Sequence, residues 1–385
     1  MIRESLHRRS LQGSSFSKHL PLVALLAATS AAGILACGND DSGDDDESTE
    51  AQALEPSDPT EVPARGEPVA PPAPPPLPPG SDTLNGLSLP AQLANWRVIG
   101  VVKVPGDPGT VRVIVGNDTA VDAARAGETN PWPDGSMMGH LQWASQPSES
   151  PGSTATVPGD FAAATLMVKN SGDYAADGGW AYGVWTTPEL RPLNNPTFDR
   201  ACVDCHTSEV ADNDFVFTIP GALPTQAAVD AAAALSNGVE LPADILDWRV
   251  IGIASREGDA NPNIRVVIGN DIAIEAARTG ETNPWPDGAM LGHYVWAAGE
   301  NPTQPDNVTP VAFNGITLMV KDSVEYADDG GWAYGNWATP ELTGAVDPAG
   351  TTFDRACVDC HTTNVADQDF VFTVPGAIPE ALFGG

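Results

Sequence analysis

The chain has 385 residues, of which 42% are hydrophobic and 6% aromatic, so it is long enough for two domains of ordinary size. Its 51 Asp and Glu residues outnumber its 18 Lys and Arg residues, giving a formal net charge of -33. This charge argues against nucleic acid as a partner.

The first 36 residues have the pattern of a bacterial export signal. Four basic residues lie before Pro21, and an apolar run, PLVALLAATSAAGILA, follows. The run is shorter than the ~20 residues that a membrane-spanning helix usually needs. It leads into ILAC, which resembles the lipobox of bacterial lipoproteins and implies cleavage before Cys37 and acylation of that cysteine. The alternative is an uncleaved helical anchor, and both predict an exported, membrane-tethered protein of the bacterial cell envelope that faces the periplasm or the cell surface.

Residues 37–83 are predicted to be a disordered tether. Twelve Asp and Glu residues occur within 38–82 against one Arg, and eleven prolines lie between Pro56 and Pro79. Such a segment has too little apolar surface to offset the entropy of ordering it. Like charges extend its first part and polyproline stiffens the second, so we expect a spacer.

The remainder of the chain is a duplicated domain. LPAQLANWRVIG returns as LPADILDWRVIG, and GETNPWPDG, TLMVK, GGWAYG and TFDRACVDCHT each occur twice in the same order. Trp96 and Trp248 are 152 positions apart, which is too long a period for a solenoid repeat. We predict one domain over 84–222 and a second over 237–380, joined by a linker over 223–236 that contains a short Ala-rich helix.

Each copy has the pattern of a small antiparallel sheet with flanking helices, a mainly β or α+β fold. VRVIVGN and IRVVIGN alternate like half-buried strands, and ATLMVK, GGWAYGVW and DFVFT predict further strands. TAVDAARAG predicts a helix that Asn117 or Asp118 caps and Gly127 ends. The prolines and glycine of ETNPWPDG predict a loop. A second helix is predicted to begin in PTFDRACVDCH, with Thr197 as its cap.

Apart from Cys37, the cysteines form two pairs, and each pair lies in the sequence CVDCH. C-x-x-C-H is the signature of c-type haem attachment, in which two thiols bond the haem vinyl groups and the adjacent imidazole binds iron. The residues concerned are Cys202, Cys205 and His206, and then Cys357, Cys360 and His361. A zinc site would need a fourth ligand, a dithiol redox motif would expect a βαβ setting, and a structural disulfide is compatible with export. Export, the histidines and the repetition favour two covalently bound c-type haems.

The ordered set PWPDG, LMVK, GGWAYG, CVDCH and DFVFT resembles the cytochrome P-460 family, over about residues 84–222 and 237–380. The resemblance implies a periplasmic c-type cytochrome with a mainly antiparallel β fold. Some members of the family are enzymes that handle hydroxylamine or nitric oxide, and in these a lysine is joined covalently to the haem. Related members without that cross-link bind small gases.

The chain departs from the enzymatic members at the position of the cross-linking lysine. That lysine falls five residues after the glycine of the PDG turn, where this chain has His140 and His293. The distal carboxylate of the enzymatic members falls near Thr165 and Thr317. The resemblance therefore does not carry hydroxylamine oxidation over to this chain, and whether it is an enzyme stays open.

Three roles are open for His140 and His293. Each is a sixth iron ligand, a distal side chain that moves protons or steadies a bound gas or peroxide, or a structural histidine. Methionine is a rival ligand, because His/Met haem is common in electron carriers. The candidate methionines are Met137, Met138, Met167, Met290 and Met319.

The leading hypothesis is a membrane-anchored dihaem c-type cytochrome that carries out electron transfer or haem redox chemistry in the bacterial envelope. The negative charge would suit a basic redox partner protein. The alternatives are a haem enzyme acting on a small nitrogen oxide, hydroxylamine or peroxide, and a gas-binding sensor.

Overall fold

The computed structural model describes residues 82–384, apart from 151–152, 259, 340–341 and 345–352. The predicted export signal over 1–36, the predicted acylation site Cys37 and all but the end of the predicted tether over 37–83 lie outside these residues. Within the described ranges, no helix is both long and apolar enough to cross a membrane.

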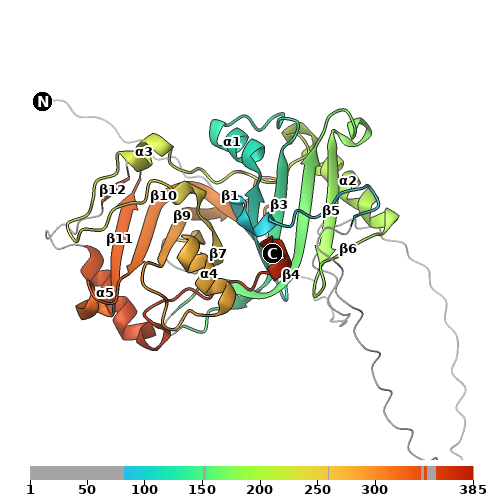
Figure 1. Ribbon diagram of the computed structural model, residues 1–385. Helices are drawn as coiled ribbons and strands as arrows, with labels where there is room; N and C mark the ends of the chain where they lie inside the picture. The colour runs from blue at the N-terminus through green and yellow to red at the C-terminus, as the bar shows by residue number, and fades with distance from the viewer. Residues whose placement is uncertain (1–81, 151–152, 259, 340–341, 345–352, 385) are drawn as a thin grey trace, which may run out of the picture. The chain divides into compact units, whose positions relative to one another are not determined.

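The first copy is an antiparallel meander whose strands pair in chain order (Figure 1). Its first strands are rich in valine and isoleucine, and consecutive residues are buried along them, so both faces of these strands are covered. The strands are β1 (Arg97–Val104), β2 (Thr110–Gly116), β3 (Met137–Pro147), β4 (Thr156–Lys169), β5 (Trp180–Thr186) and β6 (Arg191–Pro192). Its helices are α1 (Asp118–Ala126) and α2 (Pro196–Val210).

The second copy repeats this arrangement, and a short helix, α3 (Gln226–Asp230), lies between the two. The predicted linker helix is therefore shorter than its Ala-rich stretch. The strands are β7 (Arg249–Arg256), β8 (Asn263–Gly269), β9 (Met290–Glu300), β10 (Val308–Lys321), β11 (Trp332–Ala338) and β12 (Thr343–Gly344). The helices are α4 (Asp271–Thr279) and α5 (Phe353–Val365), so the mainly antiparallel β class predicted from sequence is confirmed.

Side-chain caps define where the helices begin. The Asn117 side chain accepts a hydrogen bond from the N–H of Ala120, and Gly127 ends α1 with a φ of 73°. Of the two caps proposed for α1, Asn117 is the correct one. For α2 the predicted cap Thr197 is wrong, because Asn195 accepts from the N–H of Thr197 and the fixed φ of Pro196 suits the first helical position.

The predicted strand DFVFT does not form. Asp214 and Phe215 have φ values of 48° and 61°, which lie in the left-handed region and cannot continue a strand. The segment from Val216 is irregular, and its apolar pattern instead reflects the burial of the Val216 side chain. Gly221, further along, donates its N–H to the carbonyl of Ile99 on β1.

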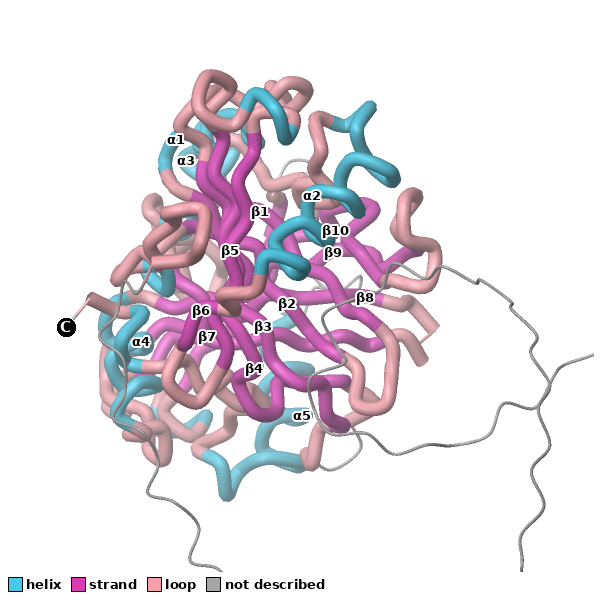
Figure 2. Tube along the Cα trace, turned by 90° about the vertical axis from the view of Figure 1, so that its right-hand side faces the viewer, coloured by secondary structure: helices cyan, strands magenta, loops and turns pink. Residues whose placement is uncertain are grey.

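Alternate residues of a strand point to opposite sides, so the strands of each copy have two faces. Both faces are buried. One face packs against the other copy in a shared core that includes the fully buried Trp143, Trp185, Trp296 and Trp337. The other face packs against the helices of its own copy. Figure 2 shows the strands gathered inside and the helices outside them.

Two reciprocal pairings join the copies into one twelve-stranded antiparallel sheet. Lys103 on β1 pairs with Val308 on β10, and Thr156 on β4 pairs with Ser255 on β7. Because β1 corresponds to β7 and β4 to β10, each copy contacts the other through equivalent strands. Both copies belong to one compact unit.

A tryptophan from each copy donates a hydrogen bond to the segment that follows the CVDCH helix of the other copy. We call this contact the tryptophan clamp. The Trp143 indole N–H donates to the carbonyl of Ala377 at 2.8 Å, and that of Trp296 donates to Ala222 at 2.7 Å. Gly376 lies against the Trp143 ring so closely that a Cβ atom there would be 2.9 Å from it. The clamp therefore needs glycine at this position.

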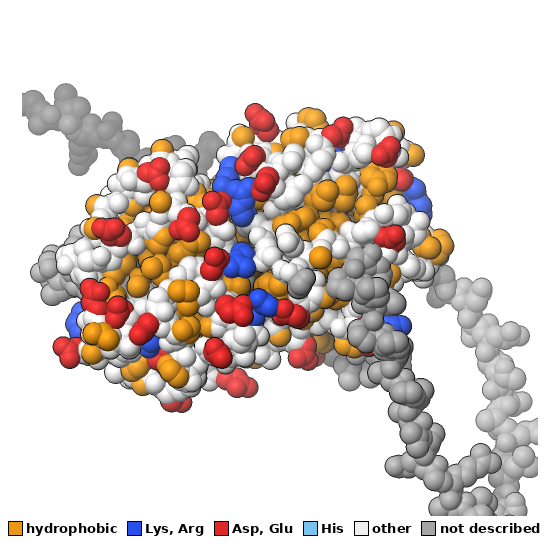
Figure 3. Space-filling model, in the orientation of Figure 1, with side chains coloured by type: hydrophobic (Ala, Val, Ile, Leu, Met, Phe, Trp, Pro, Cys, Tyr) orange, Lys and Arg blue, Asp and Glu red, His pale blue; other side chains and the backbone are white. Residues whose placement is uncertain are grey.

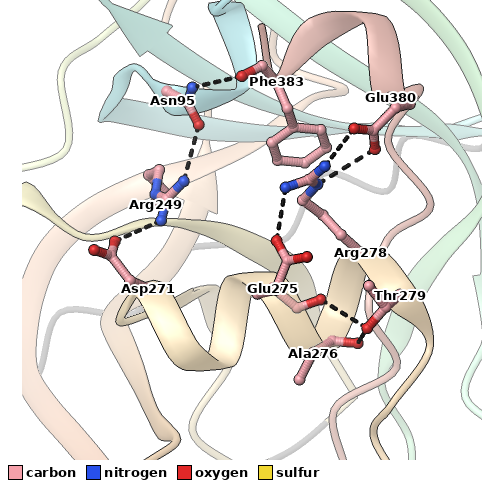
Figure 4. Close-up of polar contacts among 9 residues, drawn as sticks. All are labelled: Asn95, Arg249, Asp271, Glu275, Ala276, Arg278, Thr279, Glu380 and Phe383. Carbon is pink, nitrogen blue, oxygen red and sulfur yellow. Dashed lines mark hydrogen bonds and ion pairs between the residues drawn. The ribbon is translucent and has the colours of Figure 1, made fainter. Parts of the chain in front are cut away.

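Polar contacts near the C-terminal end of the described chain add to the contact between copies (Figure 4). Arg249 donates to Asn95 of the first copy at 3.0 Å, and Asn95 donates to the carbonyl of Phe383 at 3.0 Å. Arg278 on α4 pairs with Glu380 and lies 5.0 Å from the centre of the Phe383 ring. Asp247 of the second copy, in the position equivalent to Asn95, pairs with Arg97 at 3.1 Å.

Truncating the tryptophan of one clamp is expected to destabilise both copies. Trp143→Ala should lower the free energy of unfolding by about 3–5 kcal/mol, because it leaves a large cavity in the shared core. Trp143→Phe should cost less, since it keeps most of the packing and loses only the hydrogen bond to Ala377. Denaturant unfolding followed by fluorescence measures both. Two separate transitions, with only one shifted by Trp143→Ala, would contradict a shared core.

Candidate functional site

The CVDCH sequences lie on helices that pack along the last long strand of each sheet. Helix α2 lies against β5, and α5 lies against β11 (Figure 1). Residues three and four apart share one face of a helix, so the two cysteines and the histidine of each motif project to the same side. Cys202 and His206 are half-buried, and Cys202 packs against the apolar residues between α2 and the sheet.

His206 is oriented by a backbone carbonyl. Its Nδ1 donates to the carbonyl of Phe215 at 2.7 Å, and its ring lies 4.5 Å from the Tyr182 ring and 4.8 Å from that of Phe217. A carbonyl can only accept, so the proton of the neutral ring is on Nδ1 and the lone pair is on Nε2. Burial lowers the pKa of His206, which keeps the imidazole neutral. This is the tautomer that a metal ligand requires.

His361 has the same environment in the second copy. Its Nδ1 donates to the carbonyl of Phe370 at 2.6 Å, and the rings of Tyr334 and Phe372 each lie 4.8 Å away. Burial lowers the pKa of this imidazole as well. The two proximal arrangements are therefore equivalent.

A buried ion pair holds the turn that presents the Phe215 carbonyl. Lys169, at the end of β4, lies 2.7 Å from Asp214, and the two side chains are only 4% and 9% exposed. Asp214 also accepts from the N–H of Trp132, and the ammonium lies 5.0 Å from the centre of the Trp180 ring. The pair fixes two successive left-handed residues, Asp214 and Phe215, whose backbone strain needs such support.

The second copy repeats this pair. Lys321 lies 2.7 Å from Asp369, which accepts from the N–H of Trp285. In both copies the Phe ring of the turn covers a glycine with positive φ, Gly178 or Gly330, where a Cβ atom would collide with it. The LMVK, PWPDG, GGWAYG and DFVFT motifs therefore meet around one charged pair.

His140 and His293 lie on the sheet face that the CVDCH helix covers. On β3, Leu141 and Trp143 point into the shared core, so His140 points to the opposite face. Burial lowers the pKa of His140 to about 3, and the charges of Arg112 and His206 add to the effect.

The histidine on this face of the second copy has a hydrogen-bond partner on the neighbouring strand. His293 Nδ1 lies 3.0 Å from the hydroxyl oxygen of Thr317, its register partner on β10. Burial lowers the pKa of His293 to about 3, and the charges of Arg265 and His361 add to this. In the first copy His140 pairs in register with Thr165. The threonines that replace the carboxylate of the enzymatic relatives are thus the neighbours of the histidines that replace the lysine.

The zinc and dithiol alternatives to haem find little support in this geometry. Among the described residues, no group of three or more His, Cys, Asp and Glu side chains could hold a metal ion, as a zinc site would. The sheet is antiparallel, so the motifs do not lie in a thioredoxin-like βαβ unit. Cys202 and Cys360 are not disulfide-bonded in the described part of the chain, so neither CVDCH pair is bridged within itself, but Cys205 does take part in a disulfide.

Buried donors without protein partners fit a prosthetic group with polar substituents. Within the described ranges, the hydroxyls of Tyr182 and Tyr334 and the indole N–H groups of Trp180 and Trp332 have no hydrogen-bond partner. A buried donor left unsatisfied is costly, and it is most often explained by a ligand or water. Burial and the nearby Cys202 raise the pKa of Tyr182, so its hydroxyl stays protonated as a donor. The residues around each motif therefore fit a haem.

An antiparallel sheet with a CVDCH helix packed against it, and a further histidine on the same face, fits a haem-binding cytochrome. The family model for cytochrome P460 matches residues 90–218 and again 242–373. These matches span more than half of the chain, so the chain belongs to the cytochrome P460 family and its cofactor is haem. No curated protein matches the chain.

The structure brings most of the predicted site residues together and adds some that the sequence did not single out. Cys202, Cys205 and His206 share one side of α2, which packs on the same face of the sheet as His140, and the second copy repeats this. The rival ligand Met138 is almost fully buried, whereas Met167 is half-buried and, like Cys202, packs against the core under α2. The ion pair of Lys169 with Asp214 was not anticipated. Its only sequence signal is that a lysine and an aspartate recur at matching places in both copies.

Removing one partner of the buried ion pair should destabilise the protein severely. Lys169→Met leaves the Asp214 carboxylate buried without its cation and should cost about 3–5 kcal/mol of unfolding free energy. The double variant Lys169→Met/Asp214→Asn should recover a large part of this loss. Unfolding of the four proteins of this cycle measures the coupling. As a control, Arg200→Ala removes a solvent-exposed pair with Asp177 and should change stability little. Equal effects of Lys169→Met and Arg200→Ala would refute the structural role of the buried pair.

Proposed function

We propose that this protein is a dihaem c-type cytochrome that transfers electrons in the bacterial envelope. The observation that supports this most directly is the pair of CVDCH helices, each with a histidine whose Nδ1 is held by a backbone carbonyl. This leaves Nε2 of both histidines as the coordinating atom. When bound, haem supplies a one-electron couple between ferric and ferrous iron.

The protein's own residues have distinct roles in this proposal. Cys202 and Cys205 would form the thioether bonds and His206 the proximal bond to iron, with Cys357, Cys360 and His361 doing the same in the second copy. Arg112 and, in the second copy, Arg265 provide a cation on the distal face that suits a haem propionate. Burial lowers the pKa of Arg112 to about 10, so the guanidinium remains charged at neutral pH.

His140 and His293 are proposed as the sixth ligands. With pKa values of about 3, both imidazoles are neutral at physiological pH, as an iron ligand must be. The hydroxyl of Thr317 engages Nδ1 of His293, which leaves its Nε2 for the iron. Filled axial positions suit an electron carrier, because no site is left for substrate.

A second candidate is a haem enzyme that acts on a small nitrogen oxide, hydroxylamine or peroxide. The observation that favours it is the positive charge of Arg112, which lies near enough to His140 to lower the pKa of that imidazole. A cation beside a distal histidine would stabilise a bound anion or developing negative charge. A gas-binding sensor would use the same site without turnover.

The charge of the chain supports a basic redox partner. Figure 3 shows acidic side chains spread over the visible face, with fewer Lys and Arg side chains near its middle and at its edges. The net charge of -33 would speed association with a positively charged protein at low ionic strength. It supports no role in nucleic-acid binding.

The first prediction of the proposal concerns haem content. Protein made with the c-type maturation machinery should carry two covalent haems by intact mass and by the pyridine haemochrome spectrum. Cys202→Ala/Cys205→Ala should retain one covalent haem, in the second copy. A wild-type mass equal to that of the processed polypeptide without haem would refute the proposal.

Ligation by His140 predicts a low-spin ferric spectrum and little binding of carbon monoxide by the wild type. His140→Ala should turn one haem high-spin and open it to carbon monoxide, and His293→Ala should do the same to the other. Met138→Leu is the matched control, because the second copy has Leu291 at that place and Met138 is a rival ligand. Readily bound carbon monoxide in the wild type would instead favour the enzyme or the sensor.

Anchoring through acylated Cys37 is also proposed, on the ILAC sequence after the apolar run. Cys37→Ser should release the protein from the membrane fraction, because the acyl chains that hold it are not added. Fractionation followed by haem staining measures this. A Cys37→Ser protein that stays fully in the membrane would point to an uncleaved helical anchor.

A further inference from the structure

A buried amide on the site face of the first copy has no partner within the protein. The Gln142 side chain is only 4% exposed, and it makes no hydrogen bond with the residues that the structure describes. Its neighbours on β3, Leu141 and Trp143, pack into the shared core, so Gln142 points to the face that the helices of its own copy cover. A buried amide without partners costs free energy, and a ligand or water usually explains it.

The fold does not require an amide at this place. The second copy has Val295 in the equivalent position, between Tyr294 and Trp296, which pack into the shared core. Val295 therefore points to the same face of its sheet as Gln142 does in the first copy. A β-branched residue also suits a strand better than glutamine does. The polar side chain of the first copy thus has a role other than packing.

Arg112 lies directly across from Gln142. The two are register partners on β2 and β3, where opposed residues that share a face have Cβ atoms about 4.5–5.5 Å apart. On the other side Gln142 faces Ala163 of β4, which has no polar side-chain atom. Arg112 donates its Nε–H to the hydroxyl oxygen of Thr110 at 3.2 Å, which orients the guanidinium. Burial lowers the pKa of Arg112 to about 10, so a cation lies beside the amide at neutral pH.

The chemistry of these two side chains selects an anion. Arg112, His140 and Thr165 on this face are only half-buried, so accessible surface remains around the amide. The guanidinium and the amide NH₂ both donate hydrogen bonds, so the ligand must accept them, and the cation favours a negative charge. A planar group with two oxygens, such as a carboxylate or nitrite, matches the donor geometry of a guanidinium.

We propose that Arg112 and Gln142 form a binding site for a small planar oxyanion, and that the second copy lacks this site. The oxyanion is either a free anion such as nitrite or a carboxylate group of the haem, which presents the same two oxygens. The proposal goes beyond electron transfer. Only the haem carboxylate depends on the proposed function, because it needs a haem in the first copy.

The second copy has the cations of such a site without the amide. Arg265 corresponds to Arg112 and donates its Nε–H to Asn263 at 2.7 Å. A further cation, Arg256, stands where the first copy has Val104. Val295 offers no donor beside them, so the positive charge attracts anions without the second donor that would hold one in place.

The test is calorimetric titration of the full-length dihaem protein with nitrite in a buffer free of chloride and carboxylates. The wild type should bind one nitrite per chain, with no change in the iron spectrum. Gln142→Val should weaken binding about tenfold, because it removes a hydrogen bond to a charged ligand. Val295→Gln should add a second site. Chloride, which has no pair of oxygens, is the control anion and should bind more weakly than nitrite.

Thermal unfolding separates a ligand-binding role of Gln142 from a structural one. Without anion, Gln142→Val should unfold at the same or a higher temperature than the wild type, because it removes an unpaired buried amide. Nitrite should raise the unfolding temperature of the wild type more than that of Gln142→Val. A lower unfolding temperature for Gln142→Val without anion would show that the amide serves packing, and would overturn the inference.

A haem carboxylate at this place would give a different result. Nitrite would then release no heat, and Gln142→Val would shift the propionate bending bands in the resonance Raman spectrum. Nitrite binding that Gln142→Val leaves unchanged would overturn the inference, as would the absence of both nitrite binding and a band shift. Haem content is measured first on the same samples. Fewer than two haems would refute the proposed function, whereas two haems with neither effect of Gln142→Val would refute this inference alone.

Discussion

The buried pair of Lys169 with Asp214 is the interaction on which the proximal side of the site depends. Two charges taken from water cost several kcal/mol each unless their hydrogen bonds are satisfied. Here the carboxylate has the ammonium and the N–H of Trp132, and the ammonium also reaches a backbone carbonyl. With the pair in place, Asp214 and the next residue hold left-handed conformations, and the carbonyl that orients His206 is fixed. Lys169, at the end of β4, thus helps to fix the tautomer of His206 on α2.

The reciprocal clamp extends this constraint from one copy to the other. The segment that leaves the proximal turn runs to Ala222, where it accepts the indole N–H of Trp296. Trp296 lies on β9, three residues after His293, so the proximal side of the first site is tied to the strand that carries the distal histidine of the second. Trp143 and Ala377 make the converse link. Neither copy has a complete core or a complete proximal segment without the other, which explains why both sites lie in one compact unit.

Local patterns in the sequence were sufficient for most of the fold but not for the turn at the site. Period-two alternation predicted β2 and β8, and cap residues predicted α1, because both signals depend on neighbours in the chain. DFVFT has the same alternation, but a salt bridge to Lys169, 45 residues earlier, holds its first residues out of the strand region. A contact at that separation leaves no periodicity in one sequence. The family motifs predicted which residues gather, whereas the ion pair that gathers them emerged only in three dimensions.

Comparison of the two copies separates what the site requires from what it can vary. The residues that hold the proximal histidine are the same in both, from the ion pair to the Tyr and Phe rings that flank the imidazole. On the distal face the His, Thr and Arg recur, but Met138, Gln142 and Val184 become Leu291, Val295 and Asn336. A rigid proximal side is needed for attachment and ligation in either copy, so substitution there would disturb a buried charge. The differences between the copies therefore fall on the distal face, where the two proposed haem sites can acquire different chemistry.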